Sequence, residues 1–285
     1  MLEGFGMLDL GIYRKSTDNY LLMDDYHNDP ALNASKLTYI LPPYTPRDFF
    51  ENSKNSYFKG TKSTDLGTTI HSAILEPDTF DDLYIFEPKV FVKNTKDGKA
   101  EYQEFLDSCN GKIAVPYKDK LKVEAALLAG KNHFELQDIL AEGEAEVSAF
   151  AHLGHELIEG GIRCKTREDW ITRDGWIYDL KTTSGNLDSR SIQKTITKYK
   201  YHTKAAHHAK VMRQAGLDIK GFGWIFATTH LPVCHIVIKK CSQKFLDYAE
   251  NEHYEALELL AQCTKDGIWP GHPTDIQEID IPSYL

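Results

Sequence analysis

Two alternating runs of residues flank an Arg-Asp-Gly turn, and this arrangement constrains the fold more than any other part of the sequence. The runs cover residues 162–171 and 176–182, and the turn is formed by Arg173, Asp174 and Gly175. Alternation of apolar and polar residues is typical of a β-strand, and a glycine in the turn supplies the left-handed conformation that short hairpin loops need. The sequence therefore predicts a β-hairpin, around which the rest of the chain must build a sheet.

The length of the turn decides which side chains face each other across this hairpin. A three-residue loop places Asp169 opposite Asp179. Directly opposed side chains lie ~5 Å apart, and two carboxylates so close require a proton or a divalent cation between them. Lys181 shares their face, so the three side chains form a cluster with the oxygen ligands that Mg²⁺ prefers. A two-residue loop would instead place Leu180 opposite Asp169 and separate the two carboxylates.

The remaining patterns predict a mixed α/β protein. Helical periodicity occurs at residues 66–75, 117–140 and 191–216, and strand-like alternation at residues 146–151, 222–227 and 233–239. No repeat or low-complexity linker divides the sequence. We therefore predict one compact unit, with a helical N-terminal elaboration over residues 1–60 and the main domain over residues 61–285.

Composition and charge exclude several classes of protein. The net charge of the 285 residues is −9, yet residues 161–220 hold 13 lysines and arginines against six acidic residues. A basic segment inside an acidic protein favours a polyanionic ligand. The five cysteines are scattered and include no C-x-x-C pair, which argues against a disulfide framework or a zinc ribbon. No apolar run reaches the ~20 residues of a membrane helix, so we expect a cytoplasmic protein with no membrane partner.

The two hairpin carboxylates belong to a longer pattern of residues. Asp169 is followed after nine residues by Asp179-Leu180-Lys181, and Glu168 precedes it. The surrounding segments are Cys164-Lys165-Thr166-Arg167, Lys198 to His202, residues 26–30, 33–37, 66–77 and 269–271, and Ile281-Pro282. The central pattern resembles the PD-(D/E)xK nuclease motif, with Glu168 where that motif often has proline. The surroundings resemble the RecE-type exonuclease VIII family of bacteria and phages, which has a RecB-like nuclease domain, over most of residues 20–285.

The resemblance implies a metal site built around the hairpin. The implied metal ligands are His71, Glu146, Asp169, Asp179 and the backbone carbonyl of Leu180, with Glu144 as the alternative to Glu146. They would bind one or two Mg²⁺ ions, for which Mn²⁺ would substitute. The implied catalytic residues are Asp169, Asp179, Lys181 and Glu146. Because an unperturbed lysine has a pKa of ~10.4, we expect Lys181 to orient water and stabilise charge rather than act as a free base.

Two positions on the predicted helix over residues 191–216 depart from the family pattern. The family usually has a glutamine followed four residues later by a tyrosine, and this chain has Lys204 and His208 there. A lysine can contact a DNA phosphate as a glutamine does, so the change does not exclude activity. The implied DNA-binding residues are Lys194, Lys198, Tyr201, Lys204 and His208.

The resemblance also implies a fold and a function. The fold is a restriction-endonuclease-like α/β core, with a mixed central sheet flanked by helices. The function is Mg²⁺-dependent exonuclease action on the ends of linear double-stranded DNA, from 5′ to 3′, which leaves 3′ single-stranded tails for recombination. A homo-oligomeric ring and a single-strand annealing protein as partner are implied as well. The sequence has no G-x-x-x-x-G-K-[ST] motif, which indicates that the chain does not consume ATP.

Two other functions are compatible with the same residues. A structure-specific endonuclease would share the metal site but would also cut closed circular DNA. A non-catalytic DNA-binding protein on a decayed nuclease fold would bind DNA without Mg²⁺, and Lys204 and His208 are the reason to consider it.

Overall fold

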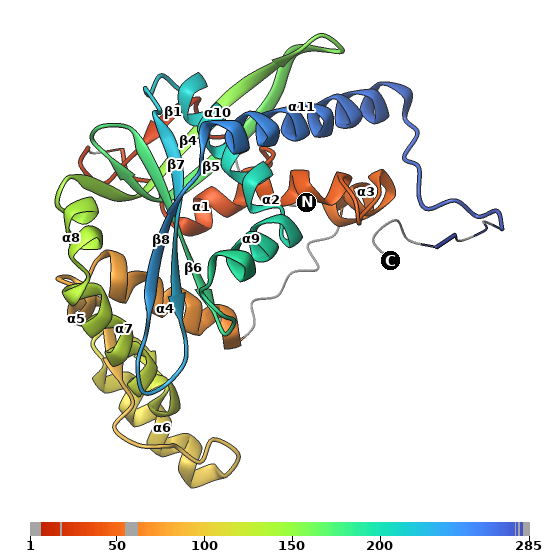
Figure 1. The fold of residues 1–285 in the computed structure, drawn as a ribbon. Coiled ribbons are helices and arrows are strands. Elements are labelled where there is room, and N and C mark those ends of the chain that lie inside the picture. The colour runs from red at the N-terminus through yellow and green to blue at the C-terminus, as the bar shows by residue number, and fades with distance from the viewer. Residues whose placement is uncertain (1–6, 18, 55–61, 277, 279, 282–285) are drawn as a thin grey trace.

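A mixed sheet forms the centre of the molecule (Figure 1). The computed structural model describes residues 7–17, 19–54, 62–276, 278 and 280–281. Within these residues the larger sheet has six strands in the order β1-β4-β5-β6-β7-β8, and its neighbours are antiparallel except for β6 and β7. Its strands are β1 (Gly11–Tyr13), β4 (Gly143–His155), β5 (Ile158–Thr172), β6 (Trp176–Thr183), β7 (Gly221–Thr228) and β8 (Ile236–Lys240). The predicted mixed sheet is confirmed.

The predicted hairpin is formed by β5 and β6, with the register of a three-residue loop. Trp170 pairs with Tyr178 and Ile171 with Ile177. Gly175 has a φ of 90°, in the left-handed region that a glycine enters without strain, and its N–H donates to the carbonyl of Thr172 at 3.0 Å. The two-residue loop is therefore excluded, because it would have shifted every pair by one residue.

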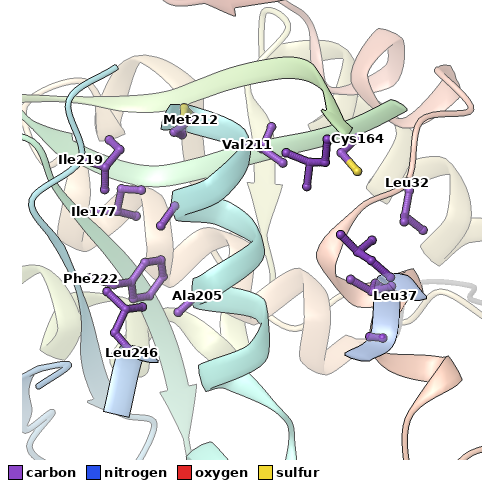
Figure 2. Close-up of a cluster of buried hydrophobic side chains, with 14 of the residues drawn as sticks. Leu32, Leu37, Cys164, Ile177, Ala205, Val211, Met212, Ile219, Phe222 and Leu246 are labelled. Atoms are coloured by element: carbon purple, nitrogen blue, oxygen red, sulfur yellow. The ribbon is translucent and has the colours of Figure 1, made fainter. Parts of the chain in front are cut away.

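Helices cover both faces of the sheet and pack on it through two separate cores. The first core joins Ile177 and Phe222 to α10 (Tyr201–Gln214) and α11 (Gln243–Asp266), as Figure 2 shows for part of it. The second core joins Leu180 and Ile225 to α4 (Lys62–Leu75), α7 (Lys120–Asn132) and α8 (Phe134–Ala141). Strand β7 contributes to both cores and is buried along its whole length, as expected for an interior strand with a parallel neighbour. None of the helices in the described ranges has the length and apolar composition to cross a bilayer.

Two of the predicted helices are each divided by one residue that leaves the helical conformation. Residues 191–216 form α9 (Ser189–Lys198) and α10, because Lys200 between them is left-handed with a φ of 55°. Lys200 Nζ is held there by Glu252 of α11 at 2.6 Å. Residues 117–140 form a 3-10 turn (Tyr117–Asp119), α7 and α8, and the extended residue His133 caps α8. The prediction of two continuous helices is wrong because one such residue leaves the apolar periodicity almost unchanged.

The N-terminal elaboration contributes to the sheet as well as to the helical layers. Its predicted helices are α1 (Met23–Asn28), α2 (Ala34–Leu37), a 3-10 turn (Thr38–Ile40) and α3 (Pro46–Lys54). Strand β1, which the sequence did not predict, pairs with β4, and Tyr13 packs edge-on against Phe150. Phe49 and Phe50 stack on Trp269 of the C-terminal segment. Residues 55–60 of the elaboration, and Pro282 of the segment that carries the resemblance, lie outside the described residues.

A smaller helical lobe projects beyond the second core (Figure 1). It contains a parallel pair of short strands that lies apart from the larger sheet. These strands are β2 (Tyr84–Phe86) and β3 (Ile113–Val115), and the helices of the lobe are α5 (Phe80–Leu83) and α6 (Lys96–Ser108).

Gly143 is expected to be essential for packing at the start of β4. A methyl group added here would lie 2.2 Å from Trp170 Nε1 and 2.7 Å from the carbonyl oxygen of Ile171. We expect Gly143→Ala to lower the free energy of unfolding by ~1–3 kcal/mol, because the overpacked indole must move. Gly154→Ala is the matched control in the same strand, since its added methyl group meets no described atom within 4 Å. Equal urea midpoints for the two variants would contradict this prediction.

Candidate active site

The hairpin carboxylates and Lys181 lie together at one cavity. This cavity, here called the catalytic cavity, has a volume of about 310 Å³ and is lined by Glu146, Asp169, Asp179 and Lys181 among others. A second cavity of about 420 Å³ is lined by His71 together with Glu146 and Asp169. The structure thus gathers residues from β4, β5, β6 and α4 where the two cavities meet.

The ladder between β5 and β6 ends just before the two carboxylates. Trp170 and Tyr178 form the last pair, so Asp169 and Asp179 would be the next pair in the same register. The Leu180 N–H donates instead to Asp169 Oδ2 at 2.7 Å. The Asp169 carboxylate therefore accepts a backbone hydrogen bond from the opposite strand, which fixes its position beside β6.

Glu146 has an unusual backbone conformation for a residue inside a strand. Its φ of 60° is rare for a residue other than glycine, and such strained conformations concentrate at functional sites. The residues on either side of it stay paired with β5 in one register, which places Glu146 opposite Asp169. Glu144, the alternative, lines neither cavity and accepts hydrogen bonds from the N–H and Oγ of Ser16. The geometry favours Glu146 as the glutamate of the site.

The acidic cluster makes ionisation of Asp169 unfavourable. Burial is the largest cause, the charge of Asp179 adds to it, and together they raise the pKa of Asp169 to about 8. His71 Nδ1 lies 3.6 Å from Asp169 Oδ2. Burial first, and then the charge of Lys181, lower the pKa of His71 to about 4, so its imidazole is neutral at pH 7. The site therefore presents a neutral histidine beside a carboxyl group that needs a compensating positive charge.

Lys181 is a fixed cation in this cluster. Its Nζ donates to Asp179 Oδ1 at 2.6 Å and lies 5.3 Å from the centre of the Tyr201 ring. Burial acts to lower the pKa of Lys181, but the charges of Asp179 and Asp169 outweigh it and raise the pKa above its ordinary value. A lysine that keeps its proton can stabilise negative charge and orient a neighbour, but it is a poor general base.

The donor set suits a divalent cation, although its members are paired with one another as they stand. Among the described residues no three His, Cys, Asp or Glu side chains are arranged to hold a metal ion. Glu146 and Asp179 each form an ion pair with a basic side chain. A neutral imidazole and facing carboxylates are nevertheless suitable ligands, and a bound cation would remove the charge repulsion that raises the Asp169 pKa. Leu180, whose carbonyl is the remaining implied ligand, follows Asp179 on β6 and donates its N–H to Asp169 Oδ2 at 2.7 Å.

The structure brings three of the five predicted DNA-binding residues to the catalytic cavity. Tyr201, Lys204 and His208 all line it from one face of α10. Lys204 Nζ lies 5.5 Å from the centre of the Tyr201 ring. Lys194 and Lys198 do not line the cavity, and both are exposed on α9.

Sequence reasoning missed several residues that line the same cavity. Lys165 and Arg167 on β5 share the face of Asp169, and the period of two could have placed them there. Lys165 is buried and donates to the backbone carbonyls of Tyr26 and Asp29 at 2.5 and 2.6 Å. The contribution of α1 and α2 to the wall of the cavity depends on contacts between distant segments, so no local signal could have revealed it.

One of the similar solved structures shares this architecture. A candidate exonuclease from Eubacterium rectale has a similar structure, with a TM-score of 0.59 and 14% identity over 92% of this chain and 96% of that one. A phage-related exonuclease from Haemophilus somnus has a TM-score of 0.30 and 11% identity, over 84% and 96% of the two chains. An alkaline exonuclease from Laribacter hongkongensis has a TM-score of 0.27 and 10% identity, over 84% and 92%. No curated protein matches the chain.

The family is shown by a match that covers most of the chain. Residues 47–280 match the PDDEXK-like domain of unknown function (DUF3799). That match agrees with the PD-(D/E)xK pattern of the hairpin and with the mixed sheet that carries it. The chain therefore belongs to the PDDEXK-like family DUF3799.

Proposed function

We propose that this protein is a divalent-metal-dependent exodeoxyribonuclease that degrades linear double-stranded DNA. The observation that carries the proposal is the meeting of Asp169, Asp179 and Lys181 at one cavity, with a carboxyl group whose pKa is raised to about 8. Repulsion of this kind is characteristic of sites that complete their charge balance with a cation. The basic wall beside the cluster, which includes Lys204, suits a polyanion.

The proposed roles of the residues follow from their positions. The ligands of the cation, Mg²⁺ or Mn²⁺ as one or two ions, would be His71, Glu146, Asp169, Asp179 and the Leu180 carbonyl. Such a cation polarises the phosphate and lowers the pKa of bound water. Lys181, held by Asp179, keeps its charge and stabilises the negative charge that develops on the phosphate during hydrolysis.

The resemblance to RecE-type nucleases supports the finer parts of the proposal. We propose degradation from 5′ to 3′ in the cytoplasm, with release of 3′ single-stranded tails for recombination. A ring of identical subunits and a single-strand annealing protein as partner belong to the same proposal.

End-labelled linear DNA tests the proposal directly. Wild type with Mg²⁺ is expected to release a 5′ label as mononucleotides before a 3′ label, and neither label with EDTA. Asp179→Asn is expected to release neither label, because it removes one carboxylate of the cluster and the partner of Lys181. Glu159→Gln, an exposed position on the same strand as Asp169, is the control that should retain activity.

Each alternative function gives a different result in this assay. Cleavage of covalently closed circular DNA by wild type would identify an endonuclease. If folded wild type binds DNA but hydrolyses none of these substrates with Mg²⁺ or Mn²⁺, the exonuclease proposal is wrong and the protein is a binding protein on a nuclease fold.

A further inference from the structure

Arg167 of β5 binds the glutamate of the site. Its Nε donates to Glu146 Oε2 at 2.5 Å. The two side chains are diagonal neighbours on one face of the sheet, because Arg167 pairs with Ser148, two residues beyond Glu146. The Arg167 side chain lines the catalytic cavity and is only 7% exposed. A nearly buried guanidinium is costly unless its N–H groups find partners, so its other contacts decide what holds it there.

The N-terminal segment supplies the other partners of this guanidinium. Arg167 Nη1 donates to the carbonyl of Leu21 at 3.1 Å, and Nη2 donates to Tyr20 Oη at 3.0 Å. The ring centres of Tyr20 and Tyr26 lie 5.6 and 5.8 Å from Arg167 Cζ, within the range of a cation–π contact. Residues 20–26 therefore hold the guanidinium in place independently of its bond to Glu146.

The contact with Arg167 occupies only one oxygen of Glu146. The other oxygen, Oε1, has no hydrogen-bond partner among the described residues, and the side chain lines both cavities. Glu146 also has the left-handed φ of 60° and no partner in the ladder, although its two neighbours pair with β5. Because the ladder does not hold this residue, the bond to Arg167 is what fixes its carboxylate beside the cavities.

We propose that Arg167 is a positioning residue of the metal site, which holds Glu146 by Oε2 and leaves Oε1 free to bind the divalent cation. The inference deepens the proposed function and rests on it for the presence of that cation. Groups that hydrogen-bond a metal ligand fix its orientation, and their loss typically costs ~10- to 100-fold in metal affinity. Leu21, 146 residues before Arg167, thereby contributes to the metal site through the guanidinium.

The charge of Arg167 would by itself have the opposite effect on the cation. A guanidinium repels a cation bound nearby, so its removal would tighten metal binding if charge were its only contribution. Removal of a positioning contact weakens metal binding instead. Lysine in place of Arg167 keeps the charge, but it lacks the planar fork that reaches Glu146 and the N-terminal segment together. The two effects therefore differ in sign for a neutral replacement.

Titration of the DNA-free protein with Mn²⁺, followed by the EPR signal of free Mn²⁺, measures this effect without hydrolysis. We expect the dissociation constant of Mn²⁺ to rise ~10- to 100-fold in Arg167→Gln, and to rise in Arg167→Lys as well. Tyr20→Phe should raise it ~3-fold, because it removes one hydrogen bond that holds the guanidinium. Arg163→Gln is the matched control and should keep the wild-type affinity. Arg163 lies on the same strand and binds Asp29 of the N-terminal segment, but it lines neither cavity.

A double-mutant cycle tests whether Arg167 acts through Glu146. If it does, the double variant of Arg167→Gln and Glu146→Gln binds Mn²⁺ no more weakly than Glu146→Gln alone, whereas additive losses would contradict this route. The EPR line shape of bound Mn²⁺ should change alike in the two single variants and stay unchanged in Arg163→Gln, which a merely structural role would not produce. Should Arg167→Gln fail to fold by circular dichroism, Arg167→Lys and Tyr20→Phe decide the positioning role.

Failure of the positioning role and failure of the proposed function are distinguishable. Unchanged or tighter Mn²⁺ binding in Arg167→Gln would overturn the positioning role, even if the wild type degrades DNA. Weaker binding in this variant of a protein that never hydrolyses DNA would support the positioning role and overturn the exonuclease. Wild type that binds no Mn²⁺ would overturn both.

Discussion

Asp169→Asn is expected to abolish DNA hydrolysis and, in the metal-free state, to make the protein more stable. The variant loses a charge that the proposed cation needs, and we expect the rate of hydrolysis to fall more than ~100-fold, beyond what loss of a mere supporting group costs. The asparagine Oδ1 can still accept the hydrogen bond from the Leu180 N–H, so the local structure should persist. The two effects have opposite signs because the charge that serves catalysis is a cost to folding.

The stability effect has a defined pH window. The folded pKa of Asp169, about 8, lies above its ordinary value of 3.8, so the folded state retains a proton that the unfolded state releases. This contribution to stability is complete below pH ~4 and is lost as the pH rises toward 8. At pH 8 in EDTA, Asp169→Asn should therefore exceed the wild type in free energy of unfolding by several kcal/mol, since each unit of pKa shift is worth ~1.4 kcal/mol.

Urea unfolding in EDTA at pH 5 and pH 8, beside the end-label assay, checks both parts. The advantage of Asp169→Asn should be larger at pH 8, and Glu159→Gln should follow the wild type at both values. A variant that is less stable than the wild type at pH 8 would show that the Asp169 carboxylate does not destabilise the folded state. If Asp169→Asn still hydrolyses DNA, then Asp169 is not required for catalysis.

The hairpin could be predicted because its information is local. Gly175 and the alternation on either side of it define the loop, and the loop defines which residues face each other. The cluster of Asp169, Asp179 and Lys181 follows from that register and the period of two along a strand. The structure adds that the backbone pairing between β5 and β6 ends just before Asp169 and Asp179. No repeating pattern of side chains can show this.

The rest of the site could not be predicted because it depends on contacts between distant segments. In the sequence, Glu168 and His208 are two separate departures from the family pattern. Only the structure shows that His208 Nδ1 contacts Glu168 Oε2, at 2.7 Å. The turn at Lys200 that points Tyr201 and Lys204 toward the cavity is held by Glu252 of α11. A pattern of helical periodicity records neither contact. It therefore placed Lys194 and Lys198 beside Lys204 on one helix, although both lie away from the cavity.

The second large effect is expected from two buried histidines, one on α10 and one on α11. His207 of α10 and His253 of α11 are both 0% exposed, and His207 Nδ1 lies 3.1 Å from His253 Nε2. His207 Nε2 lies 3.2 Å from the carbonyl oxygen of Lys165 on β5. Burial, and then the charge of a neighbouring histidine, lower the pKa of both rings well below 6.5. The lowered pKa values keep both rings neutral at pH 7, where the pair joins α10, α11 and β5.

The sign of the resulting pH dependence follows from these lowered pKa values. Because the unfolded histidines bind protons near pH 6.5 and the folded ones do not, the stability from this pair is complete above pH ~6.5 and is lost as the pH falls. Each histidine should contribute a slope of ~1.4 kcal/mol per pH unit between about pH 6 and pH 4, so the pair contributes up to ~2.7 kcal/mol per unit. We expect acid to loosen the packing of α10 against α11 and β5.

Urea unfolding from pH 7.5 to pH 4.5 tests this with His253→Leu and a surface control. His253 Nδ1 is buried without a hydrogen-bond partner among the described residues, so an apolar replacement of similar size relieves a cost at that atom while it removes one of the two proton sites. The stability of His253→Leu should fall with a slope lower than that of the wild type by ~1.4 kcal/mol per pH unit, whereas His272→Gln, exposed in the C-terminal segment, should keep the wild-type slope. Carboxylates affect all three proteins alike, so the difference in slope isolates the histidine. Equal slopes in His253→Leu and wild type would mean that His253 does not contribute to acid unfolding. The packing of α10 against α11 would then not be the acid-sensitive part of the fold.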